Sequence, residues 1–148
     1  MPIQPKRAVL MLGILAAASL ALSGPATSQP APAQGCATVQ VNNVRPGQGH
    51  LMVAAYASAE TFGKQALATL RVAADDARMQ VQLCGLAGDA VALMLFQDLD
   101  SDGKMGRNPM GIPTEPWGSS GKPGTFGPSW ETGKVALNGQ AIVVELVQ

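Results

Sequence analysis

Three aspartates alternate along one short segment of the chain and are followed at once by a glycine: Asp98, Asp100, Asp102 and Gly103. In an EF-hand calcium loop, positions one, three and five supply side-chain oxygens and position six is a glycine. The four residues match those positions, and Lys104, at position seven, would supply its backbone carbonyl. Carboxylates held this close repel one another unless a cation lies between them. The pattern therefore predicts a calcium site.

The second half of the EF-hand pattern does not follow. Position nine is Gly106, which has no side-chain oxygen, and position twelve is Pro109 instead of a bidentate glutamate. We therefore expect a shorter site on a β-scaffold, completed by Glu115 and with Asn108 as a further oxygen donor. Such a site would bind calcium weakly, with a Kd on the order of 10⁻⁴ to 10⁻³ M. The alternative is a turn whose carboxylates cap backbone N–H groups and bind no ion.

The acidic segment runs on into a long stretch rich in glycine and proline that reaches Glu131 and contains three aromatic residues. A long connection without regular structure is uncommon in a compact domain unless it is functional or packs on itself. We expect Phe126 and Trp130 to pin this stretch to the domain. Trp117 has two possible roles, the same packing or a platform for a sugar or peptide ligand.

The rest of the chain has the patterns of short β-strands. Most of the segments alternate apolar and polar residues, and residues 90–96 form a continuous apolar run typical of a central strand covered on both faces. The predicted strands are 36–44, 51–56, 69–72, 79–84, 90–96, 134–137 and 140–147. We expect hairpins between the first two strands and, across Asn138-Gly139, between the last two. The predicted fold is all-β, a small antiparallel immunoglobulin- or prealbumin-like sandwich of about seven strands with one long loop.

The N-terminus has the form of a secretory signal. Lys6 and Arg7 precede an apolar run over residues 8–22, which is short for a membrane span. Cleavage is expected after Ser28, with Ser23 as the alternative. The predicted organisation is a signal peptide over residues 1–28, a flexible leader over 29–35 and a single β-domain over 36–148. This predicts a periplasmic or secreted protein.

Cys36 and Cys84 are the only cysteines of the chain. In an exported protein an even pair is most simply a disulfide, whereas a redox pair would normally have Cys-x-x-Cys spacing. The bond would close a loop of roughly 48 residues and stabilise the fold by about 4 kcal/mol in the chain-entropy model.

The charge balance excludes one class of partner. Lys+Arg and Asp+Glu both total 10, and removing Lys6 and Arg7 leaves eight basic residues against ten acidic ones, a net charge of about −2. Nucleic-acid binding needs a basic surface, which this composition does not supply.

The long stretch also resembles a known family on its residue pattern. Asp98 to Lys104, Gly111 to Ser119 and Thr125 to Glu131 are similar to the corresponding motifs of domain of unknown function 2141, a family of secreted bacterial proteins. The resemblance implies a periplasmic or secreted β-sandwich and no established activity. Two positions depart from it, because the family often has a histidine where this chain has Gln97 and an acid where it has Gly106.

The function predicted from the sequence is an exported non-enzymatic module with a calcium-stabilised loop, which acts on an envelope or extracellular ligand. The first alternative is a carbohydrate- or peptide-binding domain that uses Trp117. The second is a glycan hydrolase in which Asp98 or Asp102 pairs with Glu115. The only histidine, His50, lies far from the loop in sequence, and no Gly-x-Ser-x-Gly motif occurs.

Overall fold

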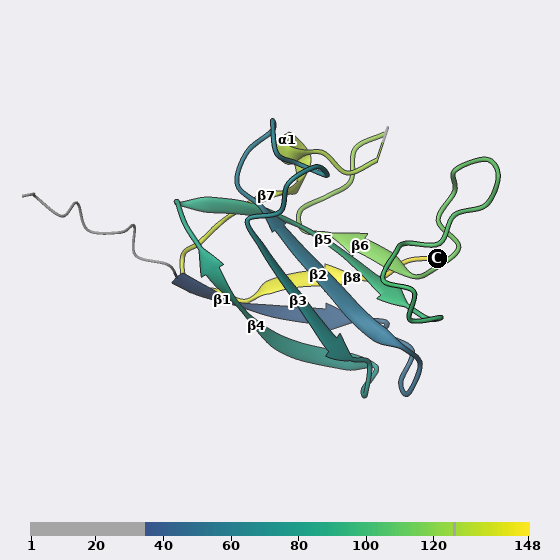
Figure 1. The fold of residues 1–148 in the computed structure, drawn as a ribbon. Coiled ribbons are helices and arrows are strands. Elements are labelled where there is room, and N and C mark those ends of the chain that lie inside the picture. The colour runs from purple at the N-terminus through teal and green to yellow at the C-terminus, as the bar shows by residue number, and fades with distance from the viewer. Residues whose placement is uncertain (1–34, 126) are drawn as a thin grey trace, which may run out of the picture.

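The computed structural model describes residues 35–125 and 127–148, which form eight strands and one short helix (Figure 1). The elements are β1 (Gly35–Asn42), β2 (His50–Tyr56), β3 (Ala68–Ala73), β4 (Arg78–Leu86), β5 (Ala90–Asp98), β6 (Trp117–Ser119), α1 (Trp130–Gly133), β7 (Lys134–Ala136) and β8 (Ile142–Glu145). The all-β prediction is confirmed. The additional strand is β6, which lies inside the stretch predicted to be an irregular loop.

The strands make two sheets that pack as a sandwich. One sheet has the order β4-β1-β8, and the other has the order β3-β2-β5-β6 with β7 also paired to β5. Every pairing is antiparallel except that of β1 with β8, which is parallel. The predicted antiparallel sandwich is therefore confirmed, with one parallel pair that was not predicted.

The core lies between the two sheets and follows from the alternation of the strands. Val39 and Val41 of β1 face Leu51 of β2 and Leu93 and Leu95 of β5, and all five are fully buried. Because side chains alternate across a strand, these residues bring one face of each sheet into the core and leave the other face outward.

Both predicted hairpins are wrong in their pairing. β1 and β2 belong to different sheets, and so do β7 and β8. The turn at Asn138-Gly139 does form, with the Asn138 side chain accepting a hydrogen bond from the Gln140 N–H at 3.1 Å. Turn chemistry shows where a chain reverses, but whether the next strand joins the same sheet or crosses to the other one depends on the packing of both sheets.

The disulfide between Cys36 and Cys84 is present and joins directly opposed residues of β1 and β4. Both cysteines are exposed. The bond ties the start of β1 to the outer strand of the three-stranded sheet.

Several predictions concern segments outside the described residues. The signal peptide over 1–28, the leader up to residue 34 and the packing role of Phe126 belong to this group. In residues 35–125 and 127–148, no helix is long and apolar enough to cross a membrane.

Candidate metal centre at the end of strand β5

Asp98 is the last residue of β5 and anchors the acidic turn. It is completely buried, although it lies opposite His50 of β2 on the face that points away from the core. Its Oδ1 accepts a hydrogen bond from the Asp102 N–H at 3.1 Å, and its Oδ2 accepts one from the Gly103 N–H at 3.0 Å. The carboxylate therefore holds the turn in shape from the end of a rigid strand.

Asp100 and Asp102 lie on the exposed side of the same turn. Asp100 Oδ1 accepts from the Asp102 N–H at 3.2 Å, and Asp102 Oδ1 accepts from the Lys104 N–H at 2.7 Å. These are the local bonds that aspartates in turns commonly make. The capping role that the sequence allows as an alternative is thus present in the structure.

The three aspartates also meet the geometric requirement for a shared cation. One carboxylate oxygen of each lies within 4.8 Å of the others. Calcium–oxygen distances of 2.3–2.6 Å place oxygens on opposite sides of the ion about 4.6–5.2 Å apart, so this spacing fits calcium. Each ionised carboxylate has about four lone-pair sites, so the hydrogen bonds to backbone leave others for a metal. Capping and metal binding are therefore compatible here.

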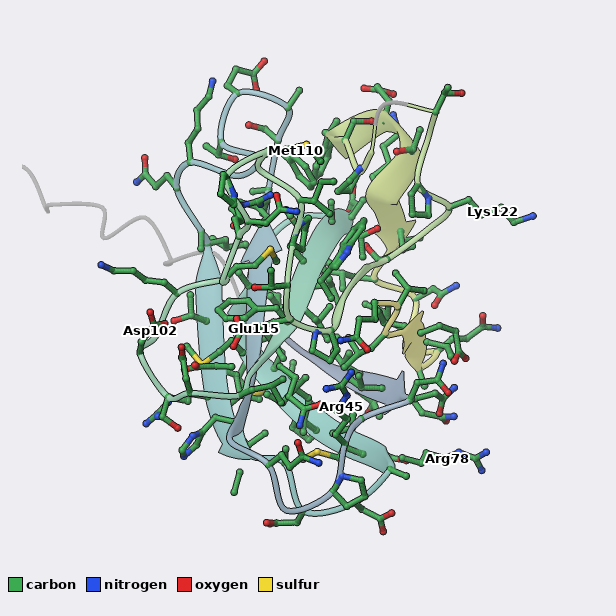
Figure 2. All side chains as sticks on the ribbon, turned by 90° about the vertical axis from the view of Figure 1, so that its right-hand side faces the viewer. Arg45, Arg78, Asp102, Met110, Glu115 and Lys122 are labelled. Carbon is green, nitrogen blue, oxygen red and sulfur yellow. A yellow bond between two sulfur atoms is a disulfide. The ribbon has the colours of Figure 1, made fainter. Side chains whose placement is uncertain are left out.

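Glu115 closes the loop at its base. It is nearly buried, and its Oε1 accepts from the Leu99 N–H at 2.7 Å while its Oε2 accepts from the Gly106 N–H at 2.8 Å. Figure 2 shows Asp102 at the outer edge of the loop and Glu115 nearer to the body of the domain. Glu115 is not in the group of three convergent carboxylates. It joins the two ends of the turn, and its role as a direct ligand stays a prediction.

Two further oxygen donors were predicted, the Asn108 side chain and the Lys104 backbone carbonyl. Asn108 uses its side-chain oxygen to accept from the Met110 and Ile112 N–H groups, both at 3.0 Å, which caps the next turn. The backbone carbonyl of Lys104 as a ligand also stays a prediction.

A buried glutamine supports the site from the core side. Gln97 is fully buried in β5; its Oε1 accepts from the Arg45 N–H at 2.8 Å, and its Nε2 donates to the carbonyls of Arg45 at 2.8 Å and Gln48 at 2.6 Å. The turn between β1 and β2 is thereby fixed against the end of β5. The sequence contained a signal for this role, since Gln97 is a polar residue at a core position directly after an apolar run.

His50 lies at the edge of the acidic turn despite its distance in sequence. Its Nδ1 is 3.2 Å from the Ser101 hydroxyl and 3.0 Å from the Arg71 guanidinium. The pairing of β2 with β5 brings His50 to this place. Sequence reasoning separated His50 from the loop because nothing local to either segment encodes that pairing.

One model of a protein family matches most of the domain that the structure describes. Residues 39–145 match the model of an uncharacterised protein family conserved in bacteria, DUF2141. The chain belongs to the DUF2141 family. A search of curated proteins and a search of solved structures find no significant match.

Trp117 of this DUF2141 member lies half-buried on β6, between two hollows. One, of about 260 Å³, is lined by Met94, Met105 and Arg107 among others. The second, of about 200 Å³, is lined by residues of β6 and β8 and by Gly121, Pro123 and Val147. The position suits a residue that contacts a ligand, and this role of Trp117 stays a prediction. Trp130 begins α1 and is half-buried.

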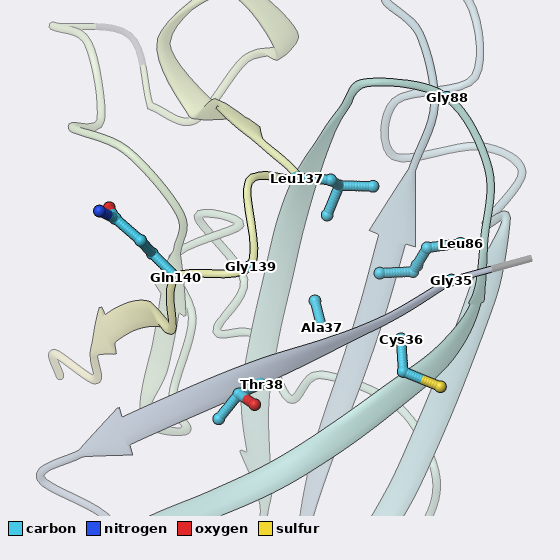
Figure 3. Close-up of a pocket in the computed structure, with 9 residues that line it drawn as sticks. All are labelled: Gly35, Cys36, Ala37, Thr38, Leu86, Gly88, Leu137, Gly139 and Gln140. Carbon is cyan, nitrogen blue, oxygen red and sulfur yellow. The ribbon is translucent and has the colours of Figure 1, made fainter.

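A further hollow of about 250 Å³ lies at the end of the sandwich that carries the disulfide (Figure 3). Ala37, Leu86 and Leu137 point toward one another across it, and its lining has no carboxylate, histidine or lysine. General acid–base chemistry needs such groups within reach of the substrate. The hydrolase alternative, in which Asp98 or Asp102 pairs with Glu115, stays a prediction.

Proposed function

We propose that this DUF2141 member is an exported, non-enzymatic β-sandwich module whose Asp98–Glu115 loop binds calcium and is stabilised by it. The observation that carries the proposal is the convergence of the Asp98, Asp100 and Asp102 carboxylates within 4.8 Å. A cation bound between the three carboxylates offsets their mutual repulsion. Without a cation, that repulsion destabilises the turn.

The residues around the three aspartates favour an ion that is coordinated by oxygen. Asp98 is fully buried at the end of a central strand, Glu115 closes the loop behind it, and Gln97 fixes the neighbouring turn. Two of the three convergent aspartates are exposed, so water can complete the coordination. Hard oxygen ligands with free positions for water suit calcium better than zinc or copper, which prefer nitrogen and sulfur.

Export is supported by two independent features. The N-terminal residues predict a secretory signal. The disulfide between Cys36 and Cys84 fits an oxidising compartment, because cytosolic thiols are kept reduced. A weak extracellular site is occupied when the calcium concentration is in the millimolar range.

Calcium is expected to raise the thermal stability of the mature chain. With a Kd of about 10⁻⁴ to 10⁻³ M, calcium at about 10 mM stabilises the folded state by roughly 1.4 to 2.7 kcal/mol. For a domain of this size that is a rise in Tm of about 5 to 10 °C. Differential scanning calorimetry in matched sodium chloride, with and without calcium, measures the shift.

The matched variants for this experiment are Asp100→Asn and Asp76→Asn. Both positions are exposed, but only Asp100 belongs to the convergent group. The first variant should lose most of the calcium shift, and the second should keep all of it. An unchanged Tm for the parent protein in calcium, or equal shifts for the two variants, would contradict the proposed site.

A further inference from the structure

The outward face of the five-stranded sheet is apolar at β5 and β6. Leu95 of β5 is completely buried in the core, so its neighbours Met94 and Phe96 point to the opposite face of the sheet. Trp117 of β6 lies opposite Phe96 in the ladder and shares that outward face. Met94, Phe96 and Trp117 are all half-buried. The outward face of an antiparallel sheet is usually polar, so adjoining apolar side chains there indicate a contact surface.

The long segment covers this face only in part and leaves a hollow of about 260 Å³ over Met94 and Trp117. Its first arm runs from β5 to β6, beside these strands, and its second arm runs from β6 to α1 (Figure 1). The walls of the hollow come from both arms and include Met105, Arg107, Pro113, Gly127 and Pro128. An apolar cavity of about 150 Å³ holds benzene, so this hollow has room for one or two fused rings.

Hydrogen bonds within the first arm hold its wall of the hollow in place. Arg107 and Pro113 form a β-bridge, and the Thr114 N–H donates to the carbonyl of Gly106 at 2.9 Å. The Glu115 carboxylate accepts from the Gly106 N–H at 2.8 Å and so fixes the start of this arm. The wall is therefore formed before a ligand arrives, which lowers the entropic cost of binding.

Arg107 gives the hollow a positive charge. Among the described residues of the lining it is the only charged one. Its Nη1 donates to the carbonyl of Gly111 at 2.8 Å, and its Nη2 lies 3.4 Å from the sulfur of Met105. Arg107 makes no ion pair within residues 35–125 and 127–148. A guanidinium has five N–H donors in a planar fork that matches a carboxylate, so donors remain for an anionic ligand.

The other side chains of the hollow suit an aromatic ring. Trp117 offers a ring for stacked or edge-to-face contact. The thioethers of Met94 and Met105 make favourable contacts with aromatic rings. Apart from Arg107 and the Trp117 indole, the described lining side chains carry no hydroxyl, amide or carboxylate group. This favours a ring with one anionic group over a sugar, whose many hydroxyls need several hydrogen-bond partners.

We propose that this hollow binds an aromatic carboxylate of one or two rings. The ring lies against Trp117 and the two methionines, and the carboxylate pairs with the guanidinium of Arg107. The ligand is a small organic anion and its contacts are separate from the three aspartates, so the inference does not rest on the calcium proposal.

The test uses indole-3-acetate as the probe and indole-3-acetamide as its neutral analogue of the same size. Isothermal titration calorimetry should give a Kd for the carboxylate below about 1 mM, as expected for a ligand of this size. The amide should bind at least about fivefold more weakly, because it lacks the charge that pairs with Arg107. The titration is made in EDTA and repeated with calcium, since the first arm begins at the acidic turn.

NMR of the ¹⁵N-labelled protein locates the bound probe. The chain has two tryptophans, Trp117 and Trp130, and only Trp117 is in the lining of the hollow. The indole N–H signal of Trp117 should shift with increasing indole-3-acetate and saturate with the calorimetric Kd. The Trp130 signal should not shift. This readout needs no substitution at the site.

Two arginine variants separate the charge of the site from the general charge of the protein. Arg107→Gln should weaken indole-3-acetate at least about fivefold and leave the affinity for the amide within about twofold. Arg78→Gln is the matched control, because Arg78 is exposed on β4 in the other sheet, and it should change neither affinity. Loss of both ligands in Arg107→Gln would show a structural role of Arg107 and contradict its pairing with the carboxylate.

Three further results would overturn the inference. They are absence of binding at about 5 mM indole-3-acetate both in EDTA and with calcium, equal affinity for the acid and the amide, and a shift of the Trp130 signal while the Trp117 signal stays unchanged. The calcium proposal is judged separately by the shift in Tm, so the failure of one does not decide the other.

Discussion

Glu115→Ala is expected to lower the free energy of unfolding by about 3 to 5 kcal/mol and to detach the acidic turn from its base. The carboxylate holds the N–H groups of Leu99 and Gly106 at 2.7 and 2.8 Å from a nearly buried position. Each hydrogen bond to a charged acceptor contributes roughly 1.5 to 3 kcal/mol, and truncation also leaves both donors without a partner. Urea unfolding measures the loss, and hydrogen exchange should show faster exchange of the Leu99 and Gly106 amides. The calcium-induced rise in Tm should disappear with the shape of the turn.

Glu131→Ala is the matched control, because Glu131 is an exposed glutamate in the same long segment. Its ion pair with Lys134, at 2.6 Å, has both side chains open to solvent. Such pairs contribute roughly 0 to 1 kcal/mol. Glu115→Gln should fall between the two alanine variants, since an amide has one acceptor oxygen for two N–H donors. If Glu115→Ala loses no more stability than Glu131→Ala, Glu115 does not close the loop.

Gly49→Ala is expected to destabilise the protein by at least about 3 kcal/mol, or to prevent folding. Gly49 has a φ of +63°, and a Cβ placed on it would lie 1.9 Å from the carbonyl oxygen of Asp98. Two sets of hydrogen bonds keep the Gly49 backbone from moving away. The Gln97 side chain donates to the carbonyls of Arg45 and Gln48. The Gly49 carbonyl accepts from the Ala74 N–H at 3.2 Å. Such an overlap must displace the end of β5, which carries the first aspartate of the site. Denaturant unfolding and the calcium shift in Tm should both report the damage.

Gly47→Ala separates conformational strain from steric overlap. Gly47 lies in the same turn with a φ of +69°, but a Cβ there meets nothing within 4 Å. The left-handed conformation alone costs a non-glycine residue roughly 1 to 2 kcal/mol. The two variants should therefore differ by at least about 1 kcal/mol. Equal losses would mean that the contact between the turn and Asp98 does not constrain the fold.

Local patterns in the sequence were sufficient for much of the fold. Alternation of apolar and polar residues located β1 to β4, and the continuous apolar run located β5. The cysteine count predicted the disulfide between Cys36 and Cys84. The motifs of the long stretch predicted the family, which the match over residues 39–145 confirms. Each of these signals is a property of neighbouring residues or of composition.

The arrangement of the strands could not be predicted in the same way. The parallel pairing of β1 with β8 and the separation of both expected hairpins between two sheets depend on how distant segments pack. β6 was missed because it has three residues and owes its pairing to β5 and Val147 rather than to its own pattern. A strand this short has little intrinsic preference, and its partners determine its conformation.

The sequence by itself determined that three carboxylates gather in the acidic turn. Asp98, Asp100, Asp102 and Gly103 are near in the chain, so their spacing alone brings the carboxylates together. Only the tertiary structure decided what surrounds them. Glu115 reaches back across the loop, Gln97 fixes the turn before β2, and His50 comes alongside Ser101 through the pairing of β2 with β5. The physical reason is that a turn is encoded by adjacent residues, whereas the residues that surround and support it come together only when segments far apart in sequence pack against one another.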